Sequence, residues 1–233
     1  MDDKEQKFKT YRSLSDMHRF RLRLFAEGIL TGIFAGIVIS FFRFALSEME
    51  YLRGALYNRL WVSDWSINAC WFAVLIAIAF ILHKLNCIEP MAAGSGIPQV
   101  KGAILGLMKM RWLHILWVKL TAGIIGIGAG LSLGREGPSI QLGAVTAQGI
   151  SRLMGRTRME ERYLLTSGAS AGLAAAFNAP LAGVIFALEE LHRNFSIMVL
   201  LPSMAAAFTA TIISRAIFGR ATIFDIPDLQ LLP

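Results

Sequence analysis

The sequence predicts an all-α polytopic membrane protein with tilted and half-spanning helices. The chain has 233 residues, of which 55% are hydrophobic and only 17% are charged, whereas about a quarter of the residues in a soluble domain are charged. Several stretches are nearly uncharged over the roughly 20 residues that a membrane span requires. They are Trp65–Leu82, Tyr163–Leu188 and Asn194–Ser214. Shorter apolar stretches that begin at Gly or Pro lie between the longer ones, which favours half-spanning helices.

The positive charge is gathered at the ends of apolar stretches. Seven basic residues precede the first apolar run, in Met1–Leu24, and more cluster in Arg152–Arg162. The positive-inside rule places both clusters on the cytoplasmic side. No base-reading module accompanies the net charge of +7, so nucleic acid is not an expected partner. We expect a basic cytoplasmic segment over residues 1–23, a membrane domain over 24–218 and a terminal loop over 219–233.

The first two helices are expected to be full-length spans. Lys4–Arg23 is a basic amphipathic segment, and the first apolar helix is predicted over Leu24–Phe44. Small residues recur in it at every fourth position, and they are Gly28, Gly32 and Gly36. Such a row permits close approach to another helix. After a loop with Asp64, the second span is predicted over Trp65–Leu85.

The rest of the chain is less regular. A helix too short to span is predicted over Gly102–Met108, and a longer one over Trp112–Gly130. A glycine-rich break precedes a short helix that ends near Arg152. The remaining predicted helices are Glu160–Phe177, with the packing pair Gly168 and Gly172, then Pro180–Arg193, and a last span that ends near Ile217.

Half-helices of this kind occur in transporters and channels, where they direct their positive N-terminal ends toward an ion at mid-membrane. The first candidate is Gly94-Ser95-Gly96-Ile97-Pro98. Glycines bring backbone N–H groups close to a ligand, and Pro98 suits a first helical turn. The unpaired N–H groups of such a helix end predict an anion site. An ordinary serine N-cap after a flexible turn is the alternative.

The second candidate is Gly134-Arg135-Glu136-Gly137-Pro138-Ser139. An ionised glutamate between apolar stretches is costly, but helix N–H groups favour a carboxylate just ahead of a helix. Glu136 therefore fits a tethered anion that competes with a permeant one and leaves when it is protonated. The alternative is a charge paired with Arg135 for stability.

The third candidate is the pair Glu189-Glu190 near the end of the helix that begins at Pro180. Adjacent helical residues point about 100° apart, so the two carboxylates cannot share one face. A carboxylate that faces the protein interior can relay protons. The alternative is a solvated helix end at the membrane interface.

These motifs, in this order and together with Phe177-Asn178-Ala179-Pro180-Leu181-Ala182-Gly183, resemble the CLC family of chloride channels and chloride/proton exchangers. The resemblance covers nearly the whole chain. It implies that Ser95 coordinates the central chloride and that Gly96 and Ile97 belong to the same anion site. The resemblance also implies that Ser95 favours chloride over nitrate or fluoride.

The resemblance assigns further roles at the second and third motifs. It implies that backbone N–H groups of Arg135, Glu136 and Gly137 form the external anion site, and that Glu136 is the gating carboxylate. It implies that Glu136 and Glu190 transfer protons. Membrane domains of this family have two halves of inverted topology, and the chain resembles only the first. A missing second half is therefore an expected partner, and the completed transporter is expected to be a homodimer.

The expected function is chloride/proton exchange across a bilayer by a multi-pass protein of the plasma (inner) membrane. A passive voltage-gated chloride channel and a non-transporting half-subunit that needs a partner remain alternatives. Glu190 favours exchange, because channels of this family generally lack that carboxylate. No nucleophile–base pair and no metal-ligand spacing is present in the sequence, so neither an enzyme nor a metal or cofactor is expected.

Overall fold

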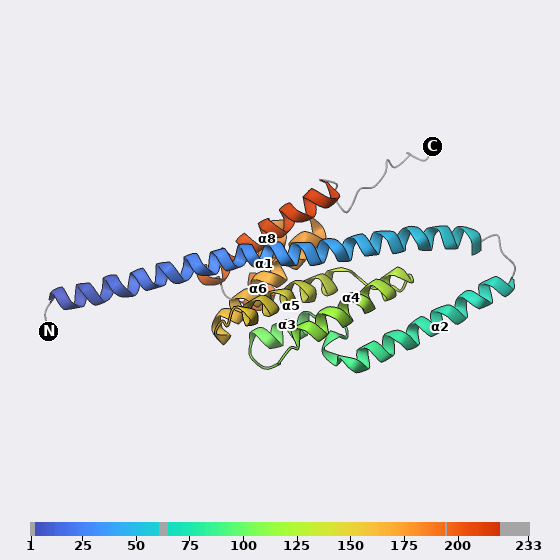
Figure 1. Ribbon diagram of the computed structural model, residues 1–233, viewed down its shortest axis with the longest axis horizontal. Coiled ribbons are helices and arrows are strands. Elements are labelled where there is room, and N and C mark those ends of the chain that lie inside the picture. The colour runs from blue at the N-terminus through green and yellow to red at the C-terminus, as the bar shows by residue number, and fades with distance from the viewer. Residues whose placement is uncertain (1–2, 61–64, 194, 220–233) are drawn as a thin grey trace.

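The structure is a computed structural model that describes residues 3–60, 65–193 and 195–219, and within these ranges every regular element is a helix. The first described helix is α1 (Asp3–Leu60), which extends along most of the length of the molecule. The chain then reverses direction into α2 (Trp65–Ile88), which diverges from α1 and has α4 (Trp112–Gly128) between the two (Figure 1). The all-α prediction is confirmed. The expected loop with Asp64 lies outside the described residues. Residues 220–233 of the expected terminal loop also lie outside them.

The expected end of the first helix at Phe44 is wrong, because α1 continues to Leu60. The sequence after Phe44 contains mostly good helix formers such as Leu, Glu, Met and Arg, with no proline. Glu50 and Arg53, one turn apart, also form an ion pair of 3.6 Å. The expected boundary between residues 23 and 24 falls inside this continuous helix and stays a prediction about where the membrane begins.

One short helix of the middle region, α3, lies between two left-handed glycines. A single turn, η1 (Pro90–Ala92), precedes α3 (Ile97–Ile104). The helix expected over Gly102–Met108 is therefore wrong. Gly96 has φ 86° and Gly106 has φ 79°, conformations that glycine adopts without a Cβ penalty. These two glycines and Pro98 place the helix five residues earlier than expected, directly after the Ser95 motif.

The remaining helices follow the predicted order. They are α4 (Trp112–Gly128), α5 (Glu136–Leu153), α6 (Arg158–Phe177), α7 (Pro180–Phe186), the π-helical segment η2 (Ala187–His192) and α8 (Ile197–Phe218). Thr157 and Glu160 form a reciprocal capping box at the start of α6. Asn178, with φ 58°, ends α6 and directs the chain into α7.

Helices α5 and α6 form the interior of the molecule, and most of their residues are buried. They approach so closely that a Cβ on Gly143 would meet the backbone oxygen of Gly168, and a Cβ on Gly172 would meet that of Ser139. The predicted packing role of Gly168 and Gly172 is confirmed. This rigid pair fixes where α5 begins, and so fixes the position of Glu136.

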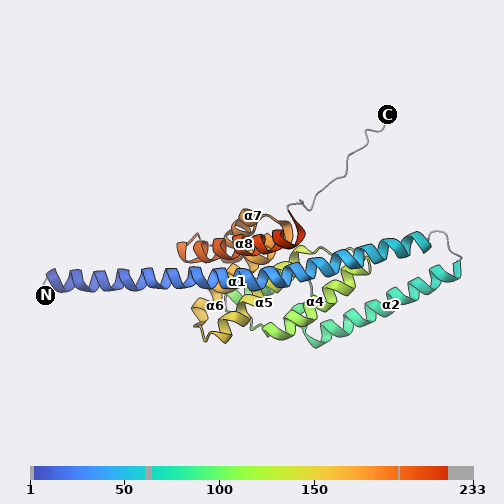
Figure 2. The same ribbon diagram turned by 45° about the horizontal axis from the view of Figure 1, so that its top comes forward.

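The predicted glycine row of α1 packs against α8, which crosses α1 at an angle in Figure 1 and lies against it in Figure 2. A Cβ on Gly28 would lie 2.6 Å from the backbone oxygen of Pro202, and a Cβ on Gly32 would lie 2.5 Å from that of Ala206. Between helices in a membrane, such close approach replaces the hydrophobic effect as a source of stability.

We expect Gly32→Ala to lower the free energy of unfolding by about 1–3 kcal/mol, because the new methyl would overlap backbone atoms that cannot move aside. The same substitution at Gly54, also in α1, is its matched control, since a Cβ there meets nothing within 4 Å. Gly54→Ala should raise stability by about 0.5–1 kcal/mol. Denaturant unfolding in detergent, followed by circular dichroism, measures both changes. Equal effects of the two substitutions would contradict the packing argument.

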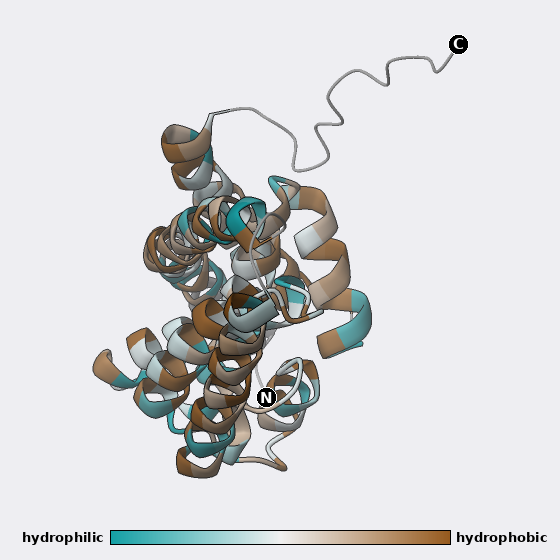
Figure 3. Ribbon diagram, turned by 90° about the vertical axis from the view of Figure 1, so that its right-hand side faces the viewer, coloured by the Kyte–Doolittle hydropathy of each residue, from teal (hydrophilic) through white to brown (hydrophobic). Residues whose placement is uncertain are grey.

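Three described helical stretches are long and apolar enough to cross a membrane, and they are Met17–Leu60, Trp65–Ile88 and Ile197–Phe218. No residue of α2 is buried in the chain, and its large side chains Trp65, Phe72 and Ile76 are 85%, 66% and 71% exposed. Hydrophobic residues recur along the helices throughout the molecule (Figure 3). A water-soluble fold would not expose so much apolar surface. The chain is a multi-pass membrane protein.

The two basic clusters that were expected on one side of the membrane do lie together. Arg23 of α1 contacts Glu160 at the start of α6 at 2.6 Å, and Arg156, just before α6, contacts Glu27 of α1 at 2.6 Å. Both clusters therefore occupy the same end of the helix bundle, as the positive-inside rule predicts for cytoplasmic segments.

Candidate anion site

The two glycine-rich motifs meet where α3 and α5 begin. Gly137, in the first turn of α5, is so close to the Ser95 loop that a Cβ on it would lie 2.6 Å from the backbone oxygen of Ser95. Any side chain at position 137 would separate the two helix starts. Helix N-termini carry unpaired N–H groups and partial positive charge. Two motifs that are about 40 residues apart in the sequence thus place their anion-attracting ends next to each other.

The Ser95 loop has a fixed shape. Gly96 is buried with φ 86°, and a Cβ there would lie 2.5 Å from the side-chain oxygen of Gln141. Gln141 is itself buried and donates from Nε2 to the Met91 oxygen at 2.7 Å. The Ser95 hydroxyl accepts a long hydrogen bond of 3.4 Å from Ile97 N–H. Ser95 remains exposed, so its hydroxyl proton is available to a ligand.

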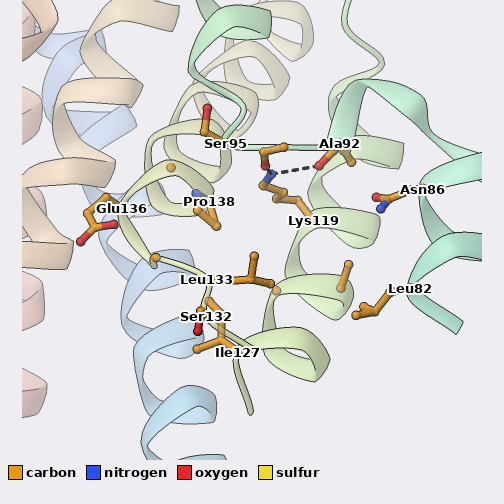
Figure 4. A pocket seen from close by; sticks show the side chains of 15 residues that line it. Leu82, Asn86, Ala92, Ser95, Lys119, Ile127, Ser132, Leu133, Glu136 and Pro138 are labelled. Carbon is orange, nitrogen blue, oxygen red and sulfur yellow. Dashed lines mark hydrogen bonds between the residues drawn. The ribbon is translucent and has the colours of Figure 1, made fainter. Parts of the chain in front are cut away.

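Glu136 is exposed at the start of α5, where its carboxylate lies against Gly134. The alternative that Glu136 is paired with Arg135 receives no support, because the two form no ion pair among the described residues. The carboxylate and the Ser95 hydroxyl point in different directions in Figure 4. Glu136 is therefore positioned at the helix start and is not held there by a salt bridge.

Lys119 of α4 is a functional candidate that sequence analysis missed. Its side chain is buried, and Nζ donates to the backbone oxygens of Ala92 at 2.9 Å and Gly94 at 2.5 Å. These two residues immediately precede Ser95, so Lys119 holds the loop in place and adds a full positive charge near it. The signal was available, because Lys119 is the only Asp, Glu, Lys or Arg between Trp112 and Gly134, and an intramembrane charge is a functional indicator.

These elements surround a cavity of about 440 Å³, which is lined by residues of α2, α4, α5 and the loops before α3 and α5 (Figure 4). Ser95, Lys119, Glu136 and Gly137 all line it. Its other walls are mostly apolar, for example Leu82 and Ile127 in Figure 4. A small set of polar groups in an apolar wall orients a ligand. The donors present, namely N–H groups, a hydroxyl and an ammonium, suit an anion.

Glu190 lies apart from this cavity, in η2. Its carboxylate pairs with Lys101 of α3 at 2.7 Å, and half of its side chain is exposed. The hydrogen bond and the charge of Lys101, together with the charge of Arg193, hold the pKa of the Glu190 carboxyl below its usual range, although desolvation acts in the opposite direction. Glu189 is exposed as well. Both carboxylates are exposed in this chain by itself, which agrees with the alternative of a solvated helix end, and the proton-transfer role of Glu190 stays a prediction.

Sequence and structure comparisons decide the family. Residues 70–233 match the family described as voltage gated chloride channel. The H⁺/Cl⁻ exchange transporter ClcA of Vibrio cholerae is 35% identical over 219 residues, which cover 88% of this chain and 46% of that protein. The ClcA protein of Citrobacter koseri is 34% identical over 238 residues, with 95% and 48% covered. The chain belongs to the voltage-gated chloride channel family.

Solved CLC structures have the same fold. A slow cyanobacterial Cl⁻/H⁺ antiporter superposes with a TM-score of 0.79 at 31% identity, over 91% of this chain and 50% of that one. A CLC-type fluoride/proton antiporter superposes with a TM-score of 0.69 at 26% identity, over 90% of this chain and 51% of that one. The chain thus spans about half the length of the CLC relatives that it matches. These relatives are transporters, in agreement with the prediction of a transport protein.

Proposed function

We propose that this chain is the first half of a chloride/proton exchange transporter of the plasma membrane, with Glu136 as its gate. The main support for this proposal is the close contact between the Ser95 loop and Gly137. This contact lies beside a cavity that is lined by Glu136 and Lys119. The relatives that are exchangers by name support exchange over a passive channel.

In this mechanism a chloride ion binds between the starts of α3 and α5. Backbone N–H groups of Gly96, Ile97 and Gly137 and the Ser95 hydroxyl are the proposed donors. Backbone donors at a helix start stabilise an anion without a neutralising side chain that would hold it too tightly to leave. Lys119 contributes a nearby positive charge while its ammonium stays bonded to Ala92 and Gly94.

Proton coupling follows from the carboxylate of Glu136. When ionised, it competes with chloride for the same N–H groups of α5. When protonated, it loses that attraction and withdraws, so chloride can enter as the proton crosses. Glu190 would exchange this proton with the cytoplasm. We further propose that a second half, of the kind that the matched relatives contain in one chain, completes the pathway, and that the completed unit forms a homodimer.

The test is parallel recording of chloride and pH from liposomes that contain the chain together with a second half. We expect an outward chloride gradient to drive protons inward against their own gradient. Liposomes without protein are the control. Chloride flux without proton movement would support the passive channel instead, and absence of both with a correctly assembled pair would support a non-transporting subunit.

A further inference from the structure

A second cavity, of about 540 Å³, lies at the opposite ends of α3 and α5 from Ser95 and Glu136. The loop from α3 to α4, the last turns of α5 and the first turns of α6 line it. Its walls are strongly basic. The basic side chains that line it are Lys109, Arg111, Arg152, Arg158 and Arg162. Glu161 is the single acidic residue that lines it.

Most of this positive charge is uncompensated. Arg111 pairs with Glu89 at 2.9 Å, and Arg152 contacts Glu161 at 3.4 Å. The other three, Lys109, Arg158 and Arg162, form no ion pair within residues 3–60, 65–193 and 195–219. Like charges around one hollow repel one another. A bound anion would relieve this repulsion, and the lining therefore indicates an anionic ligand.

A buried acceptor in the same wall restricts what the ligand can be. Gln148 is only 3% exposed and donates from Nε2 to Glu161 at 2.7 Å. Its Oε1 is buried and has no partner among the described residues. Buried polar atoms are nearly always hydrogen-bonded, so the ligand should supply a donor as well as negative charge. A hydroxyl group next to a phosphate meets both requirements.

The surroundings of the cavity indicate a lipid. Apolar side chains of the two lining loops and their flanks are exposed, with Leu107 at 79%, Leu153 at 81% and Met159 at 66%. The site lies on the side that carries the basic clusters, and basic pockets on the cytoplasmic side of membrane helices bind phospholipid headgroups. The guanidinium group of arginine matches the geometry of a phosphate.

We propose that this cavity binds the headgroup phosphate of an anionic phospholipid, with a headgroup hydroxyl donating to Gln148 and acyl chains over the exposed leucines. The ligand is not the transported ion. Gln148 is 12 residues along α5 from Glu136, which is about 18 Å of helix. The proposal therefore stands whether or not the chain takes part in chloride exchange.

The test measures binding of short-chain phosphatidylglycerol to the purified full chain in detergent by isothermal titration calorimetry. We expect phosphatidylglycerol to bind at least about tenfold more tightly than the zwitterionic phosphatidylcholine. The double substitution Lys109→Gln, Arg158→Gln should weaken phosphatidylglycerol binding by at least about tenfold, since it removes two charge-assisted contacts. Arg158→Lys, which keeps the charge but loses the guanidinium geometry, should weaken binding less than Arg158→Gln does.

Two further arms make the outcome decisive. Arg59→Gln changes an exposed arginine at the far end of α1 and should leave binding unchanged, while circular dichroism checks that each variant keeps its helices. Equal affinity for the two lipids, or no loss in the double variant, would overturn the proposal. Inorganic phosphate that binds as tightly as phosphatidylglycerol would also overturn it, because the ligand would then be a free anion.

Discussion

Glu136→Gln should leave chloride flux in place and abolish its response to external pH. The amide cannot take up a proton, and it lacks the charge that competes with chloride at the start of α5. Proton flux should fall by at least about 10²-fold, which is the lower range of what a positioned proton-transfer group contributes. Parallel chloride and pH recording from liposomes that contain the completed transporter measures both fluxes.

Glu189→Gln is the control for this result, because Glu189 is exposed and has no proposed role. It should preserve both fluxes and their ratio. If Glu136→Gln kept proton-coupled transport at the parental ratio, the tethered-anion mechanism would not apply to this protein. The stability of the fold should change little, since Glu136 forms no ion pair with a described residue.

Glu190→Gln should remove proton movement while chloride flux remains, and Lys101→Gln should keep proton movement but shift its dependence on cytoplasmic pH. Lys101 lowers the pKa of Glu190, so the carboxylate stays ionised until the pH falls well below the usual carboxyl range. Without Lys101 this pKa rises, and Glu190 accepts a proton at a higher cytoplasmic pH. The pH above which proton flux declines should therefore be higher in Lys101→Gln than in the parent.

The charged and titratable groups around Glu190 define the controls. Glu189, His192 and Arg193 flank it on η2 and just beyond, and Lys101 faces it from α3. Lys84→Gln, an exposed lysine on α2, should leave the profile in place. A proton-flux profile that is identical in Lys101→Gln and the parent would show that the ion pair does not control protonation of Glu190. Isotope-edited infrared titration of the chain alone gives the same pKa without transport.

Local signals marked where two short helices begin, although the helix expected over Gly102–Met108 was placed five residues too late. Pro98 and Pro180 mark helix starts, and Gly96 marks the left-handed turn before α3. The residues at which these helices end were harder to predict, because the end of α3 depends on the left-handed conformation of Gly106. The extension of α1 beyond Phe44 was missed, because loss of hydrophobicity was interpreted as loss of helix. Helix propensity persists in that polar segment.

Contacts between distant segments could not be predicted in the same way. The glycine row of α1 indicated a close helix partner, but nothing in the sequence named α8. Glu190 and Lys101 are 89 residues apart, and their ion pair depends on how η2 packs beside α3. Lys119 was detectable as an isolated charge, yet its bonds to the loop before Ser95 required the path of the chain from α2 through η1.

The sequence by itself determined the class of the protein, the order of its helices and the motifs that carry Ser95, Glu136 and Glu190. These properties follow from composition, hydrophobic length and local backbone chemistry, which act over a few residues at a time. Tertiary structure alone decided that the two motifs touch at Gly137, that Lys119 holds the Ser95 loop and that five basic side chains surround one cavity. Such arrangements depend on packing between helices, where small changes in crossing angle or register bring different side chains together.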